Sequence, residues 1–166
     1  CPCWPTAPPT GWAWSGPSRC GMPTPAAVFS PQTDLTLSGA SFTGRDGDDP
    51  LFRPDDIAAY ARRYLPEHDA EQAARSPLAS PVFADLSGLP PLLIQVGSRE
   101  LLHDDALRLA VNAAHADVDV TLESAARAPH NYQTAVGALA AADRALDRAA
   151  VFLADRLAER AAASAD

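Results

Sequence analysis

The sequence contains no lysine, and its thirteen basic side chains other than histidine are all arginine, against twenty-one acidic residues. The formal net charge is −8 and the pI is near 4.8. The arginines are dispersed along the chain, so no stretch offers the dense positive surface that nucleic acid phosphates or anionic lipids need. The composition therefore argues against nucleic acid and against an anionic membrane surface as partners.

Long apolar runs are also missing. No segment approaches the roughly eighteen consecutive apolar residues of a transmembrane helix, and the N-terminus lacks the basic and leucine-rich regions of a secretion signal. We therefore expect no membrane span and a cytoplasmic location. Cysteine is confined to Cys1, Cys3 and Cys20. Cys1 and Cys3 resemble half of a metal site, but no second Cys/His pair follows at a zinc-like spacing, so no metal is expected.

The first 25 residues differ from the rest of the chain. They hold all three tryptophans and seven prolines, but no leucine, isoleucine or valine, and neither helical nor strand periodicity can be found in them. We expect 1–25 to be an irregular leader, either a disordered Pro-rich segment or a stretch read out of frame from GC-rich codons. Residues 26–163 are then expected to form one domain.

Beyond the leader, short apolar runs alternate with helical patterns. The runs AAVFS, LLIQVG and VDVTLE predict strands at 26–30, 92–97 and 118–123. Helices are predicted at 53–65, 103–116 and 135–163, and irregular chain at 38–53 and 76–91. Strands that alternate with helices in this way indicate an α/β fold, a parallel sheet with helices on both faces.

Helical spacing also predicts which side chains face the core. The residues assigned to buried faces are Ile57, Tyr60, Ala61 and Tyr64 in the first helix, Leu107, Val111 and Ala114 in the second, and Leu139, Leu146, Phe152 and Leu153 in the last.

Two polar segments follow strands of this predicted sheet. GSRELLHDD comes after the strand at 92–97, and SAARAPHNYQ comes after the strand at 118–123. The carboxyl ends of parallel strands lie at one edge of the sheet, where binding sites form. If the two strands are neighbours, Glu100 and His130 emerge at the same edge.

Several segments resemble the C-terminal half of the hormone-sensitive-lipase-like branch of the α/β-hydrolases. They are SPQTDLTLSG, DPLFRPDDIAAYARRYLP, SPLASPVFADLSGLPPLLIQVGSRELLHDDALRLA and VDVTLESAARAPHNYQ, and the resemblance extends over about residues 21–157. The run from Ser76 to Asp105 is the most specific part. It holds the Ser-Pro-Leu-x-Ser-Pro segment, the Pro-Pro before the strand and the acid-x-Leu-x-Asp-Asp turn in family order.

The resemblance implies roles for two residues. Glu100 takes the place of the acid of a catalytic triad, and His130 takes the place of the general base. The family chemistry is the hydrolysis of short to medium acyl esters through a Ser-acyl intermediate, without a cofactor or metal. In this fold the triad residues occur in the order Ser, Asp or Glu, then His, and Glu100 before His130 fits the last two.

The nucleophile of the family is missing from this sequence. It would lie in a Gly-x-Ser-x-Gly elbow, with an oxyanion hole drawn from an upstream His-Gly-Gly segment, and neither motif is present. Ser15 and Ser18 lack a preceding strand, and Pro17 forbids a sharp strand-to-helix elbow. Ser30 follows a strand but precedes Pro31 and lacks flanking glycines, so we interpret it as a strand-end residue.

Other readings of these residues remain open. Without the resemblance, Glu100 would be a solvated carboxylate in the first turn of a helix, and His130 a surface histidine. Asp104, one helical turn further on, competes with Glu100 for the role of the acid. His68, His103 and His115 lack any comparable context. Asp34 and Tyr132 are candidates for the walls of the site.

The sequence therefore predicts the C-terminal portion of a carboxylic ester hydrolase, esterase- or lipase-like, with a small-molecule ester as its partner and an open oligomeric state. An alternative is a non-catalytic homologue that binds a small molecule, as in the plant gibberellin receptors of the same branch, or an inert truncated homologue. Retention of His130 favours catalysis. We further expect the three strands to lie side by side, with the outer edge of the strand at 26–30 bare.

Overall fold

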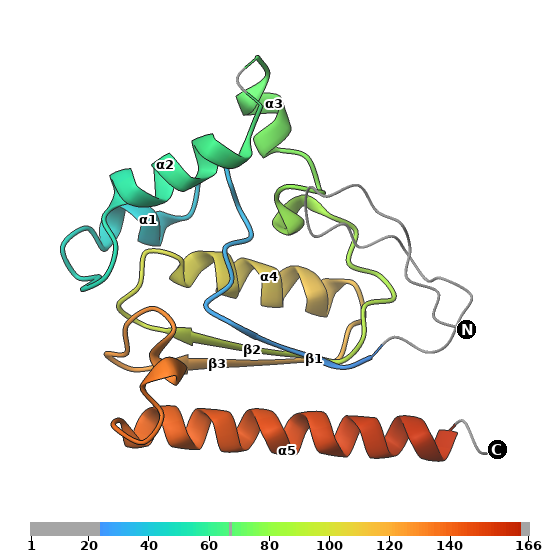
Figure 1. Cartoon of the computed structure of the whole chain (residues 1–166). Helices are drawn as coiled ribbons and strands as arrows, with labels where there is room; N and C mark the ends of the chain where they lie inside the picture. The colour runs from blue at the N-terminus through green and yellow to red at the C-terminus, as the bar shows by residue number, and fades with distance from the viewer. Residues whose placement is uncertain (1–23, 67, 164–166) are drawn as a thin grey trace.

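The computed structural model describes residues 24–66 and 68–163 and shows a small parallel sheet between helical layers (Figure 1). Almost all of the expected leader at 1–25 lies outside these residues. So do the three cysteines and the two serines at positions 15 and 18.

The sheet has three parallel strands, β1 (Ala26–Phe29), β2 (Leu92–Gly97) and β3 (Val120–Ala125), in the order β1-β2-β3. The register pairs Ala26 with Leu92, and Leu92 with Val120. The predicted arrangement of three neighbouring parallel strands is thus confirmed, although β3 begins two residues later than expected. Every residue of β2 is buried, as its continuous apolar sequence predicts for a central strand.

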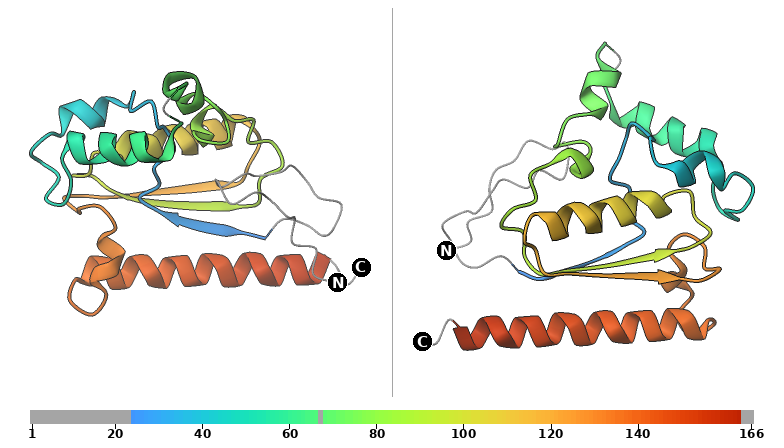
Figure 2. Two further views of the ribbon diagram at one scale, coloured as in Figure 1. Left: turned by 45° about the horizontal axis from the view of Figure 1, so that its top comes forward. Right: turned by 180° about the vertical axis from the view of Figure 1, so that it is seen from behind.

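The helix α4 (His103–His115) covers one face of the sheet, and α5 (Ala140–Ala163) covers the other (Figures 1 and 2). On the α4 side, Ile94 and Val96 of β2 pack in one cluster with Ala106, Leu109 and Ala113 of the helix.

The predicted buried face of α4 was wrong. Val111 is 53% exposed, and neither Leu107 nor Ala114 is buried, whereas Ala106, Leu109, Ala110 and Ala113 are. Both sets have helical spacing, because apolar residues cover more than one side of this helix. The face in contact with the sheet is the one that carries the small alanines.

The α5 helix also packs through small side chains. Its buried residues are Ala142, Ala145 and Ala149, whereas Leu139 is 39% exposed and none of the other large residues assigned to its apolar stripe is buried. Alanine lets the helix backbone approach the strands closely, which the larger side chains would prevent. Among the described residues, no helix is both long enough and apolar enough to cross a membrane.

Three further helices lie on the α4 side of the sheet, α1 (Ala40–Gly44), α2 (Pro54–Tyr64) and α3 (Ala70–Ala74) (Figure 1). A short 3-10 helix, η1 (Pro81–Phe83), follows, and a second, η2 (Tyr132–Ala135), precedes α5. α2 is one residue shorter at each end than the predicted helix at 53–65. The expectation of irregular chain at 38–53 was wrong for α1, because five residues are too few to show periodicity.

The face of α2 is only partly as predicted. Ile57 is buried against Leu101 and Leu102 in the turn that follows β2. Ala61 is also buried, whereas Tyr60 and Tyr64 are about half exposed. At the start of the helix the backbone N–H of Arg53 donates to Oδ2 of Asp56 at 3.0 Å.

Candidate active site

The loops that follow the three strands meet at one edge of the sheet. Ser30 follows β1, Glu100 lies in the turn after β2, and His130 lies in the loop after β3. Because the strands are parallel and adjacent, their carboxyl ends lie together. Ser30 is therefore in hydrogen-bonding contact with Glu100, 70 positions away, and with Asn131, 101 positions away.

Glu100 is held in the turn after β2 and is fully buried. Its Oε1 accepts the backbone N–H of Gly97 at 2.5 Å and the hydroxyl of Ser30 at 2.8 Å. Its Oε2 lies 2.8 Å from Nδ1 of His130. A buried carboxylate requires hydrogen-bond donors, and this one has three.

Gly97 allows the loops after β2 and β3 to approach each other. A Cβ atom at this position would lie 2.3 Å from the carbonyl oxygen of Ala128 and 2.6 Å from that of Pro129. The same two loops are joined by the N–H of Arg99, which donates to the carbonyl of Ala128 at 3.1 Å. Because Gly97 has no side chain, the segment that leads into His130 can lie close to the end of β2.

His130 is partly buried, with 14% of its side chain exposed. Because Glu100 accepts at Nδ1, the neutral ring carries its proton there and leaves the lone pair of Nε2 available. In this structure the side-chain amide of Asn131 lies 2.8 Å from Nε2. The ring of Phe52 meets the imidazole edge-on, with centroids 5.1 Å apart. The arrangement gives the histidine one defined tautomer.

The buried carboxylate of Asp49 fixes the backbone at Phe52 and also bonds to the turn that carries Glu100. Asp49 Oδ1 accepts the backbone N–H of Leu51 at 2.9 Å and of Phe52 at 3.1 Å, and its Oδ2 accepts that of Leu101 at 3.1 Å. This loop between α1 and α2 is therefore fixed relative to the carboxylate of Glu100.

Asp104 does not contact His130. Its Oδ2 accepts the backbone N–H of Ser41 at 3.0 Å, and the hydroxyl of Ser41 accepts the N–H of Asp104 at 2.9 Å. This reciprocal pair joins the start of α1 to the start of α4. Asp104 therefore bonds to the backbone of Ser41, and Glu100 is the carboxylate that contacts His130.

Among the described residues, the side chains of the other histidines make no hydrogen bond to Glu100 or His130. His103 Nε2 is 3.0 Å from Ser124 Oγ, and its Nδ1 is 3.4 Å from a guanidinium nitrogen of Arg45. Burial, together with the charge of Arg45, lowers the pKa of His103 below its usual range. The same Nδ1 lies 3.7 Å from Oδ1 of Asp104. His68 and His115 are exposed.

Two aspartates join the segment after β1 to α4. Asp34 is fully buried and forms an ion pair with Arg108 at 2.6 Å. Burial opposes its ionisation, but hydrogen bonds from Ser38, Thr36 and Arg108 outweigh this effect and lower the pKa of Asp34 to about 2. It has no hydrogen bond to Glu100 or His130, so its role is to fix this segment.

Asp105 was not singled out from the sequence. Its Oδ2 accepts the backbone N–H groups of Thr33 at 2.8 Å and Asp34 at 2.9 Å. Burial raises the pKa of Asp105 to about 6 despite these hydrogen bonds. In the sequence, only the adjacent acids Asp104 and Asp105 at the start of the predicted helix pointed to this carboxylate. Such acids are equally explained by a favourable interaction with the helix dipole.

A buried amide network ties the sheet to α5 next to the histidine loop. Gln95 Nε2 donates to Glu123 Oε2 and to the carbonyl of Ala145, both at 2.8 Å, and Gln133 Nε2 donates to Gln95 Oε1 at 3.2 Å. Tyr132 is buried here among alanines, and burial raises its pKa. Tyr132 thus supports the loop from within the core.

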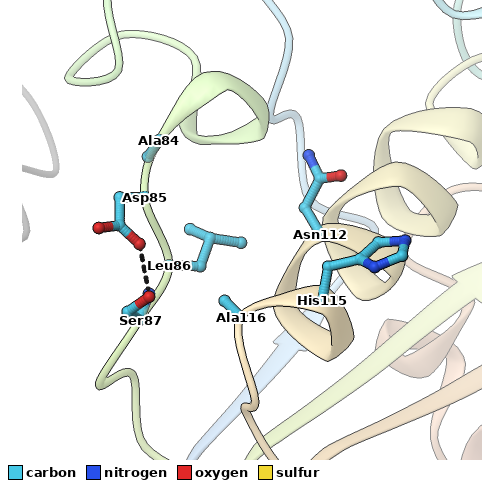
Figure 3. A pocket seen from close by; sticks show the side chains of 7 residues that line it. All are labelled: Ala84, Asp85, Leu86, Ser87, Asn112, His115 and Ala116. Atoms are coloured by element: carbon cyan, nitrogen blue, oxygen red, sulfur yellow. Dashed lines mark hydrogen bonds between the residues drawn. The ribbon is translucent and has the colours of Figure 1, made fainter.

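A shallow hollow of about 310 Å³ lies elsewhere, between the chain after η1 and the C-terminal end of α4 (Figure 3). Its polar lining includes Asp85, Asn112 and His115, and the carboxylate of Asp85 accepts the N–H of Ser87 at 2.9 Å. Because Glu100 precedes the other end of this helix of thirteen residues, the hollow is about 20 Å from the candidate site and does not form part of it.

Comparisons with known proteins identify the family of this fold. Residues 14–134 match the family described as alpha/beta hydrolase fold. An acetyl-hydrolase from Streptomyces hygroscopicus is 44% identical over 135 residues, which cover 80% of this chain and 44% of the relative. An esterase from Acinetobacter venetianus is 40% identical over 99 residues, covering 60% of this chain and 32% of the relative.

Solved structures show the same relationship. A hormone-sensitive lipase from a metagenome library has a TM-score of 0.76 at 37% identity, covering 82% of this chain and 45% of that one. An esterase from the bacterial hormone-sensitive lipase family has a TM-score of 0.74 at 37% identity, covering 80% and 43%. The chain thus spans less than half the length of these relatives. The matched profile, the sequence identity and the shared fold together show that the chain belongs to the α/β-hydrolase fold family, in its hormone-sensitive-lipase-like branch.

Proposed function

We propose that Glu100 and His130 are the acid and the general base of the Ser-Glu-His triad of a carboxylic ester hydrolase. The observation that carries this proposal is the 2.8 Å contact between Glu100 Oε2 and His130 Nδ1, with the carboxylate fully buried. A buried carboxylate on the far nitrogen of a histidine holds the ring in one tautomer and stabilises the imidazolium that forms during catalysis.

The chemistry follows from this pair. Nε2 of His130 takes the proton of a serine hydroxyl as that oxygen attacks the ester carbonyl, and Glu100 stabilises the resulting imidazolium. The ring then returns the proton to the leaving alcohol, and a second cycle with water releases the acid. In the reacting complex the serine hydroxyl would take the position beside Nε2 that the amide of Asn131 holds here.

No described serine is placed to act as this nucleophile. The hydroxyl of Ser30 donates to Glu100, and that of Ser98 accepts the N–H of Arg127 at 2.8 Å. Because the sequence also contains no Gly-x-Ser-x-Gly motif, the chain of 166 residues on its own is proposed to lack esterase activity. The oxyanion donors that stabilise the transition state by about 3 to 4 kcal/mol would also have to come from outside it.

The names of the relatives support the substrate class. They include an acetyl-hydrolase and an esterase, and the solved relatives include an esterase of the bacterial hormone-sensitive lipase family. We therefore assign the complete enzyme to small esters with short acyl groups. This chemistry uses the serine, histidine and carboxylate side chains and the oxyanion donors.

The test uses hydrolysis of p-nitrophenyl acetate. The unmodified chain of 166 residues should be no faster than its His130→Ala variant. The chain joined to the N-terminal half of the Streptomyces acetyl-hydrolase should gain activity, and His130→Ala in that fusion should lose several powers of ten, because triad members act as a unit. A fusion that is folded and active, yet indifferent to His130→Ala, would contradict the assignment.

A further inference from the structure

Ser30 is bonded to both loops of the proposed acid–base pair. Its Oγ donates to Oε1 of Glu100 at 2.8 Å and accepts the backbone N–H of Asn131 at 3.0 Å. Asn131 directly follows His130. Ser30 is only 4% exposed, and these bonds use its one hydroxyl proton and one of its lone pairs. A single hydroxyl therefore joins the loops that carry the acid and the base.

The backbone of Ser30 adopts an unfavourable conformation in order to make these contacts. Its φ is 45°, in the left-handed region, although Ser30 has a side chain and precedes Pro31. Its N–H still donates to the carbonyl of Gln95 at 2.8 Å, as the continuation of the β1–β2 pairing. Such strain persists where the surrounding structure requires it and is concentrated at functional sites.

The contacts of Ser30 also define what it does not do. Its hydroxyl faces the carboxylate of Glu100, whereas Nε2 of His130, the atom that would activate a nucleophile, faces the amide of Asn131. Ser30 therefore bonds to the acid of the pair and makes no hydrogen bond to Nε2, so it is not placed as the nucleophile.

We propose that Ser30 is a positioning residue that keeps the imidazole of His130 in the tautomer with its proton on Nδ1. By binding Oε1 it leaves Oε2 of Glu100 directed at Nδ1, and by binding the N–H of Asn131 it fixes the loop that carries the ring. This inference rests on the proposed function, because only this tautomer leaves Nε2 free to accept the proton of a nucleophile.

The test is NMR of the whole chain with ¹⁵N-labelled histidine, at a pH where the imidazole is neutral. In the unmodified chain His130 should show the Nδ1–H tautomer, with slow solvent exchange of that proton. Ser30→Ala and Ser30→Gly should both accelerate this exchange about tenfold, as expected for the loss of one buried hydrogen bond, and populate the Nε2–H tautomer.

The two substitutions separate positioning from stability. Glycine adopts a φ of 45° without strain and alanine does not, so Ser30→Gly should be more stable to urea than Ser30→Ala. The tautomer shift should nevertheless be the same in both. An effect confined to the less stable variant would overturn the proposal, as would an unchanged tautomer in both.

Ser98→Ala provides the matched control. It removes a hydroxyl at the same sheet edge, one that accepts the N–H of Arg127 at 2.8 Å, and should leave the His130 signal unchanged. The same shift in this variant would indicate general loosening of the loops and overturn the role of Ser30. If the unmodified chain itself lacks the Nδ1–H tautomer, the Glu100–His130 pair fails, and both proposals fall together.

Discussion

The carboxylate of Asp105 accepts the backbone N–H of Thr33 at 2.8 Å, across 72 residues of chain. It binds the N–H of Asp34 with the same oxygen, so one buried side chain at the start of α4 holds the segment that follows β1. Burial raises the pKa of Asp105 from 3.8 to about 6, and this shift makes the stability of the fold depend on pH.

The sign of that dependence follows from proton binding. Between about pH 4 and 6 the folded chain binds a proton at Asp105 that the unfolded chain has lost, so the free energy of unfolding falls as the pH rises through this range. Asp105→Asn keeps an acceptor oxygen but does not titrate. Relative to this variant, the free energy of unfolding of the unmodified chain should fall by on the order of 2 kcal/mol between pH 4 and 7.

Urea unfolding of both proteins at several pH values measures this difference. Asp34 does not confound the result, because its pKa is lowered to about 2 and its contribution is lost only as the pH falls below this window. A constant difference between the unmodified chain and Asp105→Asn would refute the prediction.

Gly97→Ala should strongly destabilise the chain. The new Cβ would lie 2.3 Å from the carbonyl oxygen of Ala128, so the loop that leads to His130 would have to move away from the end of β2. We expect a loss of more than about 2 kcal/mol in urea unfolding. Gly44→Ala is the matched control, since no neighbouring atom lies within 4 Å of the Cβ, and it should change stability by about 0.5 kcal/mol or less. Equal effects of the two substitutions would contradict this account.

The parts of the fold that could be predicted from the sequence were those with a strong local signal. The uninterrupted apolar run of β2 and the acidic start of α4 each identify one element, and adjacent parallel strands then bring Glu100 and His130 to one edge. The buried face of α4 could not be predicted, because Leu107 and Leu109 both belong to plausible apolar stripes and only contact with the sheet decides between them.

The long-range hydrogen bonds of the site could not be predicted from the sequence pattern. Ser30 looked like the last residue of a strand, and nothing near it in the chain indicates a bond to a carboxylate 70 residues away. The carboxylate of Asp105 was equally hidden, because an acid in the first turn of a helix needs no further partner. Both contacts depend on the relative placement of loops, which is set only when the sheet assembles.

The outer edge of β1 should cause the isolated chain to associate. Within the described residues β1 pairs only with β2, and the N–H groups of Ala26 and Ser30 point to that neighbour. Backbone groups alternate along a strand, so those of Ala27 and Phe29 face outward and offer an unpaired edge. Sedimentation velocity should show dimers or larger species that increase with concentration.

A proline at the outward-facing position tests the route of this association. Ala27→Pro removes an outward N–H without removing a bond to β2, and it should shift the chain towards monomer while preserving its circular dichroism spectrum. A monodisperse monomer that unfolds cooperatively without this substitution would count against the prediction.

The final prediction compares the two candidate acids in the fusion with the N-terminal half of the Streptomyces acetyl-hydrolase. Glu100→Gln should lower kcat for p-nitrophenyl acetate by about 10³- to 10⁴-fold, because the amide no longer fixes the tautomer of His130 or stabilises its imidazolium. Asp104→Asn keeps an oxygen that can accept the N–H of Ser41, so its effect should stay within about tenfold. The loss in Glu100→Gln should lie below that in His130→Ala, since the imidazole itself remains. If Asp104→Asn is the more damaging of the two, the acid lies one helical turn further along SRELLHDD, and the 2.8 Å contact between Glu100 and His130 is not the catalytic one.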